Sequence, residues 1–283
     1  MVEYFQNHDG VVLNRSLAVP PLALALVLLA AFLHAGWNLL LHGTEDRLAA
    51  ATVAGLVAGA ALLPVIILAP PWQVWPLILL SALAECAYAI FLTNAYRLGA
   101  LSLAYPLARG SAPLLVTLGG WLLLSQPPTI WTLAGAGALA LGLASVATAG
   151  KRSGQGVAIA FALLTGVAIA TYATIDAGAV RVVNPVGYLG AVLGIQGILL
   201  VGFLRGDLGR LKRAAWPGIQ IAAGSTAAYL LVLLAFQRAN AGPVATLREV
   251  SVLIGVLLAR EQKGPRIWLG AALVVLGAIL TAI

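Results

Sequence analysis

AYRLGALSLAYPLARGSAPLL, residues 95–115, is similar to AFQRANAGPVATLREVSVLIG, residues 235–255, and their alignment places Arg109 opposite Glu249. A second pair of stretches, TIWTLAGAGALALGLASVA and RIWLGAALVVLGAILTAI, repeats more loosely and a few positions out of register. Because the two stretches follow each other in the same order in both halves of the chain, we interpret the protein as two copies of one structural unit.

The composition favours a membrane protein. Of the 283 residues, 61% are hydrophobic and 9% are charged, and the mean hydropathy is +1.01, which is far from an average soluble domain. A helix of about 20 apolar residues crosses the hydrocarbon core of a bilayer. Ten segments of about that length are present: 20–42, 48–69, 74–98, 100–124, 128–149, 155–175, 185–204, 215–239, 242–261 and 264–283. The sequence therefore predicts an all-α membrane protein with ten transmembrane helices.

The repeat predicts how these segments are organised. We expect an N-terminal tail at 1–19, a first five-helix repeat at 20–149, a linker at 150–154 and a second five-helix repeat at 155–283. Five is an odd number of spans, so the second copy enters the membrane with the opposite orientation to the first. The expected fold is an inverted repeat of five plus five helices around a central cavity, an arrangement typical of transporters.

Charge and cysteine content exclude several classes of function. The net charge is +7, but the Lys and Arg residues lie mainly in short loops, which indicates anchoring in a bilayer and not nucleic-acid binding. Cys86 is the single cysteine, so an internal disulfide and a cysteine-based metal cluster are excluded. A phosphate-binding loop with its Lys and Ser or Thr is absent, which excludes nucleotide-driven pumping by this chain. We expect no cofactor and no metal.

Loop charge gives one prediction of orientation. Eleven basic residues follow the odd-numbered segments and three lie on the other side: Arg47, Arg97, Lys151, Arg152, Arg205, Arg210, Lys212, Arg213, Arg260, Lys263 and Arg266, against Arg15, Arg181 and Arg238. Positively charged loops stay in the cytoplasm. Taken alone, this rule places both termini outside the cell.

Three motifs carry a resemblance to a known family: HAGWN at 34–38, YPLARGSAPLL at 105–115, and the closing pattern LLAREQ followed by IWLGAALVVLGAIL. With the five-plus-five duplication, they resemble the ten-helix EamA-type branch of the drug/metabolite transporter superfamily. The resemblance implies a ten-helix basket around a central cavity and export of small metabolites, with the aromatic amino acid exporters as the nearest group. It also implies cytoplasmic termini, opposite to the loop charge, so orientation stays open.

Few charges lie within the apolar segments, and each costs about 2.5 to 3.5 kcal/mol at the centre of a spanning helix unless it has a partner or faces water. They are Glu85, Arg109, Arg248 and Glu249. We interpret Arg109 as facing the cavity, neutralised by Glu85 or Glu249, and binding an anionic group of the cargo. The alternative is an Arg–Glu pair that only fixes helix packing.

Aromatic and polar side chains complete the predicted site. Five aromatic residues occur at depths suited to a cavity, where their rings can stack on a flat cargo: Trp37, Tyr88, Tyr105, Tyr172 and Tyr229. His34, Asn38 and Glu85 are candidates for a polar track that exchanges protons. Six other tryptophans lie at segment ends and are assigned to the membrane interface: Trp72, Trp75, Trp121, Trp131, Trp216 and Trp268.

These observations predict a secondary transporter that exports small metabolites, chiefly aromatic or other neutral amino acids, across the cell inner (plasma) membrane by alternating access. The substrate-binding residues are expected to be His34, Trp37, Asn38, Glu85, Tyr88, Tyr105, Arg109, Tyr172, Tyr229, Arg248 and Glu249. The expected partners are a small-molecule substrate and the lipid bilayer, with the protein a monomer or weak dimer. The alternative is an integral-membrane enzyme acting on lipid or isoprenoid substrates. Such an enzyme needs an acidic or metal-binding cluster, whereas the four Asp residues, Asp176 among them, are read as isolated and mostly in loops.

Overall fold

The computed structural model describes residues 19–99, 101–149, 156–258 and 264–282, and within these ranges the regular structure is entirely helical. The predicted linker and nearly all of the predicted N-terminal tail lie outside the described residues. Five basic residues used to predict orientation also lie outside them: Arg15, Lys151, Arg152, Arg260 and Lys263.

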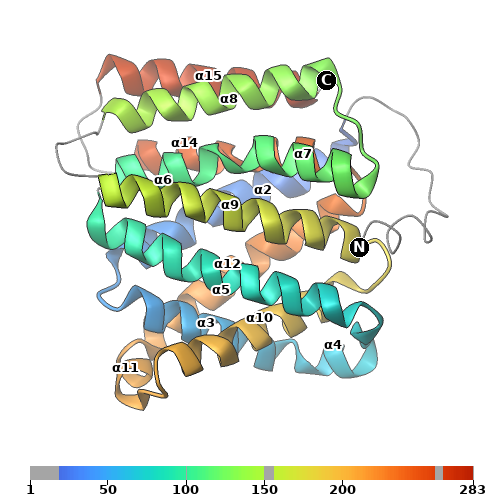
Figure 1. Ribbon diagram of the computed structural model, residues 1–283, viewed down its shortest axis with the longest axis vertical. Coiled ribbons are helices and arrows are strands. Elements are labelled where there is room, and N and C mark those ends of the chain that lie inside the picture. The colour runs from blue at the N-terminus through green and yellow to red at the C-terminus, as the bar shows by residue number, and fades with distance from the viewer. Residues whose placement is uncertain (1–18, 100, 150–155, 259–263, 283) are drawn as a thin grey trace.

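The helices of the first half lie mainly across the long axis of the molecule (Figure 1). They are α2 (Pro21–Gly43), α3 (Arg47–Ala61), α4 (Leu63–Leu68), the 3₁₀ helix η1 (Trp72–Val74), α5 (Trp75–Leu98), α6 (Leu101–Gly110), α7 (Ala112–Leu124) and α8 (Ile130–Ala149). Those of the second half are α9 (Gly156–Ala179), α10 (Pro185–Phe203), α11 (Leu208–Arg213), α12 (Ala215–Phe236), α13 (Ala241–Arg248), α14 (Val250–Leu258) and α15 (Pro265–Ala282).

Six helical stretches in the described part of the chain are long and apolar enough to cross a membrane: Pro21–Gly43, Trp72–Leu98, Leu107–Leu124, Gly156–Ala179, Pro185–Phe203 and Ala215–Phe236. Shorter apolar helices lie at Arg47–Ala61, Ile130–Ser145 and Trp268–Ala282. The prediction of an all-helical chain with apolar helices of membrane-spanning length is therefore confirmed for the described residues. The number of ten spans stays a prediction.

Proline and short polar side chains fix the helix boundaries. Asp46 caps α3 by accepting a hydrogen bond from the Ala49 amide, and Asn184 caps α10 through the Val186 and Gly187 amides. These side chains satisfy amides that have no partner in the first turn of a helix. Pro113 lies in the first turn of α7, just after the break at Ser111. A proline is tolerated there because the first-turn amide has no intrahelical partner.

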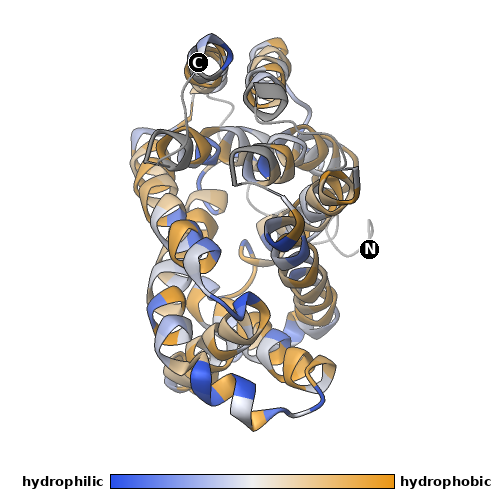
Figure 2. Ribbon diagram, turned by 90° about the vertical axis from the view of Figure 1, so that its left-hand side faces the viewer, coloured by the Kyte–Doolittle hydropathy of each residue, from blue (hydrophilic) through white to orange (hydrophobic). Residues whose placement is uncertain are grey.

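The helices pack in four main pairs: α8 with α15, α5 with α9, α2 with α12, and α3 with α10. In the end-on view of Figure 2 the helices surround a common interior, with α8 and α15 paired at the top. Apolar residues colour much of the helices, many large apolar side chains are exposed, and the hydrophilic stretch at the bottom includes the short basic helix α11. A surface of this kind suits contact with lipid along the sides of the bundle.

Glycines allow the closest of these contacts. A Cβ atom placed on Gly59 of α3 would lie 2.5 Å from the Cα of Gly194 in α10, and one on Gly55 would lie 2.9 Å from the Leu193 carbonyl oxygen. A Cβ on Gly135 of α8 would lie 2.7 Å from the Gly277 carbonyl oxygen in α15. Small residues at helix crossings are characteristic of packing within membranes, where backbones approach each other directly.

Candidate functional site

A cavity lies between helices α2, α3, α5, α9, α10 and α12, with about 710 Å³ of empty space that includes volume open to solvent. The lining residues are His34, Trp37, Leu41, Ala51, Ala54, Gly55, Glu85, Tyr88, Ala89, Leu92, Thr93, Tyr172, Leu193, Gln196, Ile221, Ser225 and Tyr229. Both halves of the chain contribute to this lining, so the cavity exists only when the two halves are packed together.

Three tyrosines form a connected aromatic wall. The ring of Tyr172 on α9 lies 5.7 Å from that of Tyr88 on α5 and 5.5 Å from that of Tyr229 on α12, measured between centroids. The interplanar angles of 79° and 86° give edge-to-face contacts, the favourable geometry for rings with a negative face and a positive edge. Trp37 on α2 adds a fourth ring, with its own contact of 5.9 Å to the ring of His34.

Glu85 is the acidic group of the cavity. It lies in the middle of α5 and is 6% exposed. Its side chain makes no ion pair and accepts no hydrogen bond from the residues that the structure describes, while its backbone carbonyl accepts one from the Gln196 side chain at 3.3 Å. An ionised carboxylate within a membrane needs a partner or water. This carboxylate is therefore available to a solute in the cavity.

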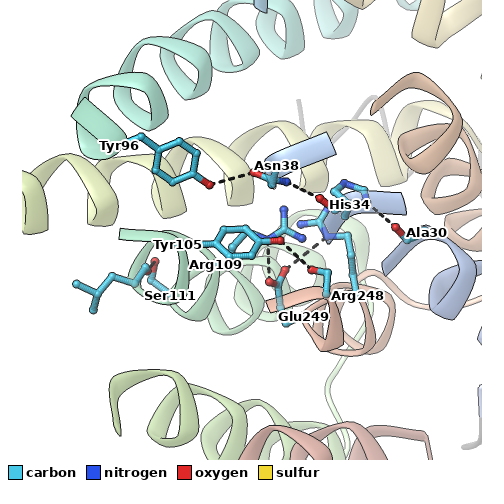
Figure 3. A network of polar contacts seen from close by, with 11 residues as sticks. Ala30, His34, Asn38, Tyr96, Tyr105, Arg109, Ser111, Arg248 and Glu249 are labelled. Carbon is cyan, nitrogen blue, oxygen red and sulfur yellow. Dashed lines mark hydrogen bonds and ion pairs between the residues drawn. The ribbon is translucent and has the colours of Figure 1, made fainter. Parts of the chain in front are cut away.

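The HAGWN motif forms a chain of hydrogen bonds along α2 (Figure 3). The His34 Nδ1 atom donates to the Ala30 carbonyl at 2.9 Å, and the Asn38 side chain donates to the His34 carbonyl at 2.8 Å. The Tyr96 hydroxyl donates to the Asn38 side-chain oxygen at 3.0 Å. Asn38 therefore links α2 to α5 and is not part of the cavity lining, so the expected track from His34 through Asn38 to Glu85 is interrupted.

The structure corrects the expected position of Asp176. The sixth segment was expected to end at residue 175, which placed this carboxylate in a loop, but α9 continues to Ala179 and buries Asp176 completely. Its Oδ1 atom accepts hydrogen bonds from the hydroxyls of Ser81 and Tyr188, both at 2.6 Å, and its Oδ2 atom accepts one from Tyr229 at 2.5 Å. Three hydroxyl donors thus hold one carboxylate between α5, α9, α10 and α12.

A second polar cluster lies where two helical segments are interrupted, between α6 and α7 and between α13 and α14. Arg109, at the end of α6, donates from Nε to the Glu249 carboxylate at 2.8 Å, and Nε of Arg248 lies 3.5 Å from the other Glu249 oxygen. All three side chains are at most 2% exposed. Tyr105 donates to Ser251 at 3.4 Å within the same group. Figure 3 shows these side chains converging near His34, and none of them lines the cavity.

The structure thus divides the predicted site into two parts. The residues that line the cavity are His34, Trp37, Glu85, Tyr88, Tyr172 and Tyr229, and those that do not are Asn38, Tyr105, Arg109, Arg248 and Glu249. Arg109 does not line this cavity, and its guanidinium is bonded to Glu249, one of the two partners expected for it. Its binding of an anionic group of the cargo stays a prediction. Sequence reasoning missed Gln196 and Asp176, and no motif marks either residue.

Comparisons with known proteins add information on the fold. No family profile matches the chain, and no curated protein sequence matches it. A solved crystal structure of a protein with 17% sequence identity superposes with a TM-score of 0.70, covering 92% of this chain and 96% of that chain. At this identity the likeness shows that nearly the whole chain adopts a fold already seen in a crystal. Within the described residues, no group of three His, Cys, Asp or Glu side chains is placed to hold a metal ion.

Proposed function

We propose that the protein is a secondary transporter that exports small metabolites, amino acids among them, across the cell inner (plasma) membrane by alternating access. The observation that carries the proposal is the cavity, which lies among apolar helices from both halves of the chain and is lined by the carboxylate of Glu85, a group with no ion-pair partner among the described residues. Ionisable groups buried among membrane helices usually mark the path of a substrate or ion.

The packing of the helices supports the predicted inverted repeat. The repeat equates α2 with α9, α3 with α10, α5 with α12 and α8 with α15. If the halves are related by a two-fold axis, contact between α5 and α9 requires contact between α12 and α2, and both are among the four main pairs. The remaining two main pairs, α3 with α10 and α8 with α15, are contacts between equivalent helices, as expected near such an axis.

The interrupted helices support the same arrangement. Arg109 and Glu249 are equivalent positions in the sequence repeat, and their side chains are hydrogen bonded to each other. Equivalent residues meet only close to a two-fold axis. Each also lies beside a helix break, at Ser111 between α6 and α7 and at Glu249 between α13 and α14. Broken helices at the interface between repeats are a recurrent feature of transporters.

Proton coupling belongs to this proposal through Glu85. A carboxylate that lines a cavity and has no partner among the described residues can exchange a proton with water in that cavity. His34 lies in the same lining. Asn38 has no part in the coupling, since its side chain is engaged by His34 and Tyr96 outside the lining.

The test is counterflow in liposomes. Purified protein is reconstituted with one unlabelled amino acid inside, the labelled amino acid is added outside, and each amino acid is assayed with and without a pH gradient. Saturable accumulation that Glu85→Gln reduces supports the proposal, and the matched control is Glu45→Gln at an exposed position between α2 and α3. If neither an amino acid nor any other small metabolite exchanges, the transport function is refuted, and turnover of a lipid substrate would favour the enzyme alternative.

A further inference from the structure

We infer that the cavity recognises the ammonium group of its cargo and does not require a carboxylate, so that amines are bound as well as amino acids. The inference rests on the proposed function, because it names the substrate class of the transport cavity. It is carried by three features of the lining: its charge, the commitment of its hydrogen-bond donors, and its aromatic rings.

The first feature is the sign of the charge. Glu85 is the acidic side chain of the lining, and no Lys or Arg is among the described residues that line the cavity. The nearby cations Arg109 and Arg248 do not line the cavity, and both guanidinium groups are directed at Glu249. An ammonium group would bring the countercharge that an ionised Glu85 lacks, whereas a carboxylate would add a second negative charge in a medium of low dielectric constant.

The second feature is that the polar side chains of the lining have already committed donors to other parts of the protein. The His34 Nδ1–H group donates to the Ala30 carbonyl, so the neutral ring has only an acceptor at Nε2. The Tyr229 hydroxyl donates to Asp176, and the Thr93 hydroxyl donates to the Ile90 carbonyl. Gln196 uses one N–H of its side-chain amide on the Glu85 carbonyl, which leaves its second N–H and its oxygen open.

These four side chains present acceptors toward the cavity, and the hydroxyls of Tyr88, Tyr172 and Ser225, which make no hydrogen bond with the described residues, can accept as well as donate. An ammonium group has three N–H donors and no acceptor, so it complements such a surface. Asp176 takes part indirectly, because it does not line the cavity. It accepts the hydrogen bond that the Tyr229 hydroxyl donates, so this hydroxyl can act only as an acceptor toward the cavity. The indole N–H of Trp37 can only donate, and it is buried with no partner among the described residues. It is neutral and offers a carboxylate one hydrogen bond without charge.

The third feature is the aromatic wall. A cation over the face of a tyrosine or tryptophan is attracted by the ring quadrupole, and the attraction increases when water is excluded. Trp37, Tyr88, Tyr172 and Tyr229 come from four different helices and are each at most 9% exposed. Tyr172 contacts two of the other rings and is therefore the centre of the wall.

The test uses three ligands that share a phenyl ring and a short chain. Phenethylamine carries only the ammonium group, phenylalanine carries both charges, and 3-phenylpropionate carries only the carboxylate. Their dissociation constants are measured by titration calorimetry on the purified full-length chain. We expect phenethylamine and phenylalanine to bind at least tenfold more tightly than 3-phenylpropionate. This comparison needs no variant and is unaffected if a substitution prevents folding.

Variants locate the effect in the cavity. Glu85→Gln should weaken phenethylamine at least tenfold and leave 3-phenylpropionate unchanged, and Tyr172→Leu should weaken phenethylamine several-fold. Glu45→Gln is the control, because it removes the same charge at an exposed position, and it should leave the binding of all three ligands unchanged. Equal or tighter binding of 3-phenylpropionate, or binding of none of the three ligands, would overturn the inference. Glu85-dependent binding of phenethylamine without counterflow of any metabolite would instead refute transport and leave the ammonium site standing, whereas counterflow of 3-phenylpropionate would support transport and overturn the ammonium site.

Discussion

Glu249 lies between two guanidinium groups in a part of the protein that excludes solvent. It accepts a hydrogen bond from Arg109, and Arg248 completes an ion pair with its second oxygen at 3.5 Å. Three nitrogens of the Arg248 guanidinium have no hydrogen-bond partner among the described residues. Removing one member of a buried ion pair is costly because the remaining charge stays buried without compensation.

At the residue scale, Glu249→Gln should therefore destabilise the protein by about 3 to 5 kcal/mol. The substitution keeps the shape of the side chain but leaves two buried cations without a counterion. The measurement is the midpoint of thermal unfolding of the purified protein in detergent, with Glu45→Gln as control. An unchanged midpoint together with lost transport would show that Glu249 acts on the cargo and not on the packing of the broken helices.

Asp176→Asn is a second prediction at this scale. The carboxylate accepts from Ser81, Tyr188 and Tyr229, whereas an amide has one oxygen and a nitrogen that donates. At least one hydroxyl must then lose its acceptor, at a cost of about 1 to 3 kcal/mol. Tyr188→Phe, which removes a single donor away from the cavity lining, should lower the unfolding midpoint less. Equal stability of Asp176→Asn and the wild type would contradict this account.

At the scale of elements, the crossing of α3 and α10 depends on glycine. A Cβ atom on Gly59 meets the backbone of Gly194 at 2.5 Å, and backbone cannot move aside as a side chain can. We expect Gly59→Ala to lower the midpoint of thermal unfolding and to reduce the yield of folded protein. Gly36→Ala in α2 is the control, because nothing lies within 4 Å of the added methyl group, and alanine is the better helix former by about 0.8 to 1 kcal/mol. Equal effects at the two sites would exclude a close crossing.

The loop before α3 is tied to α11 by an ion pair that depends on pH. Arg210 donates two hydrogen bonds to Asp46, at 2.6 and 3.0 Å, and these bonds lower the pKa of Asp46 below its ordinary value of 3.8. A lowered pKa gives stability that is present above the unfolded value and is lost as the pH falls through the folded value.

Asp46→Asn should accordingly be less stable than the wild type at pH 7, by at most about 1 kcal/mol because the pair is partly exposed. The difference between the two proteins should disappear as the pH falls below 3.8, where the wild-type carboxylate also becomes protonated. Thermal unfolding of both proteins between pH 7 and pH 3 measures this, with Glu45→Gln as the control. A difference that grows on acidification would have the wrong sign and would refute the role of Asp46.

At the scale of the whole molecule, the number of spans can be tested through accessible cysteines. Arg97 lies at the end of the third predicted segment and Lys212 follows the seventh, so ten spans place both on one side of the membrane. Were only the six long apolar helices to span it, these residues would lie on opposite sides. Arg97, Lys212 and Asn240 are exposed, and the native Cys86 is buried.

We expect Arg97→Cys and Lys212→Cys, each combined with Cys86→Ala, to react with a membrane-impermeant maleimide from the same side of intact cells or vesicles. Asn240→Cys, which follows the eighth segment, should react from the opposite side. Labelling of Arg97→Cys and Lys212→Cys from opposite sides would refute ten spans. The side on which they react also decides between the orientation given by loop charge and that implied by the family resemblance.

The tryptophans show how far local sequence predicts burial. Those at segment ends were assigned to the interface from their polar neighbours, and all six are 49 to 69% exposed: Trp72, Trp75, Trp121, Trp131, Trp216 and Trp268. Trp37, in the middle of a segment beside His34 and Asn38, was assigned to the interior and is 7% exposed. The distance of a tryptophan from the end of its segment is a local property of the sequence. The sequence can therefore predict whether that side chain is exposed or buried.

The sequence by itself determined the helical class, the apolar stretches of membrane-spanning length, and the short set of charges and aromatic rings from which a site could be made, because hydrophobic length and the cost of a buried charge are local quantities. Only the tertiary structure decided which of these groups face the cavity. Glu85 and Glu249 are chemically equivalent and lie at similar depths in apolar segments, yet one faces the cavity and the other holds two arginines. Asp176 became part of a buried network because α9 continues beyond the expected boundary. The rotation of a helix about its axis and its choice of neighbour depend on contacts between residues far apart in the chain, and no local pattern contains them.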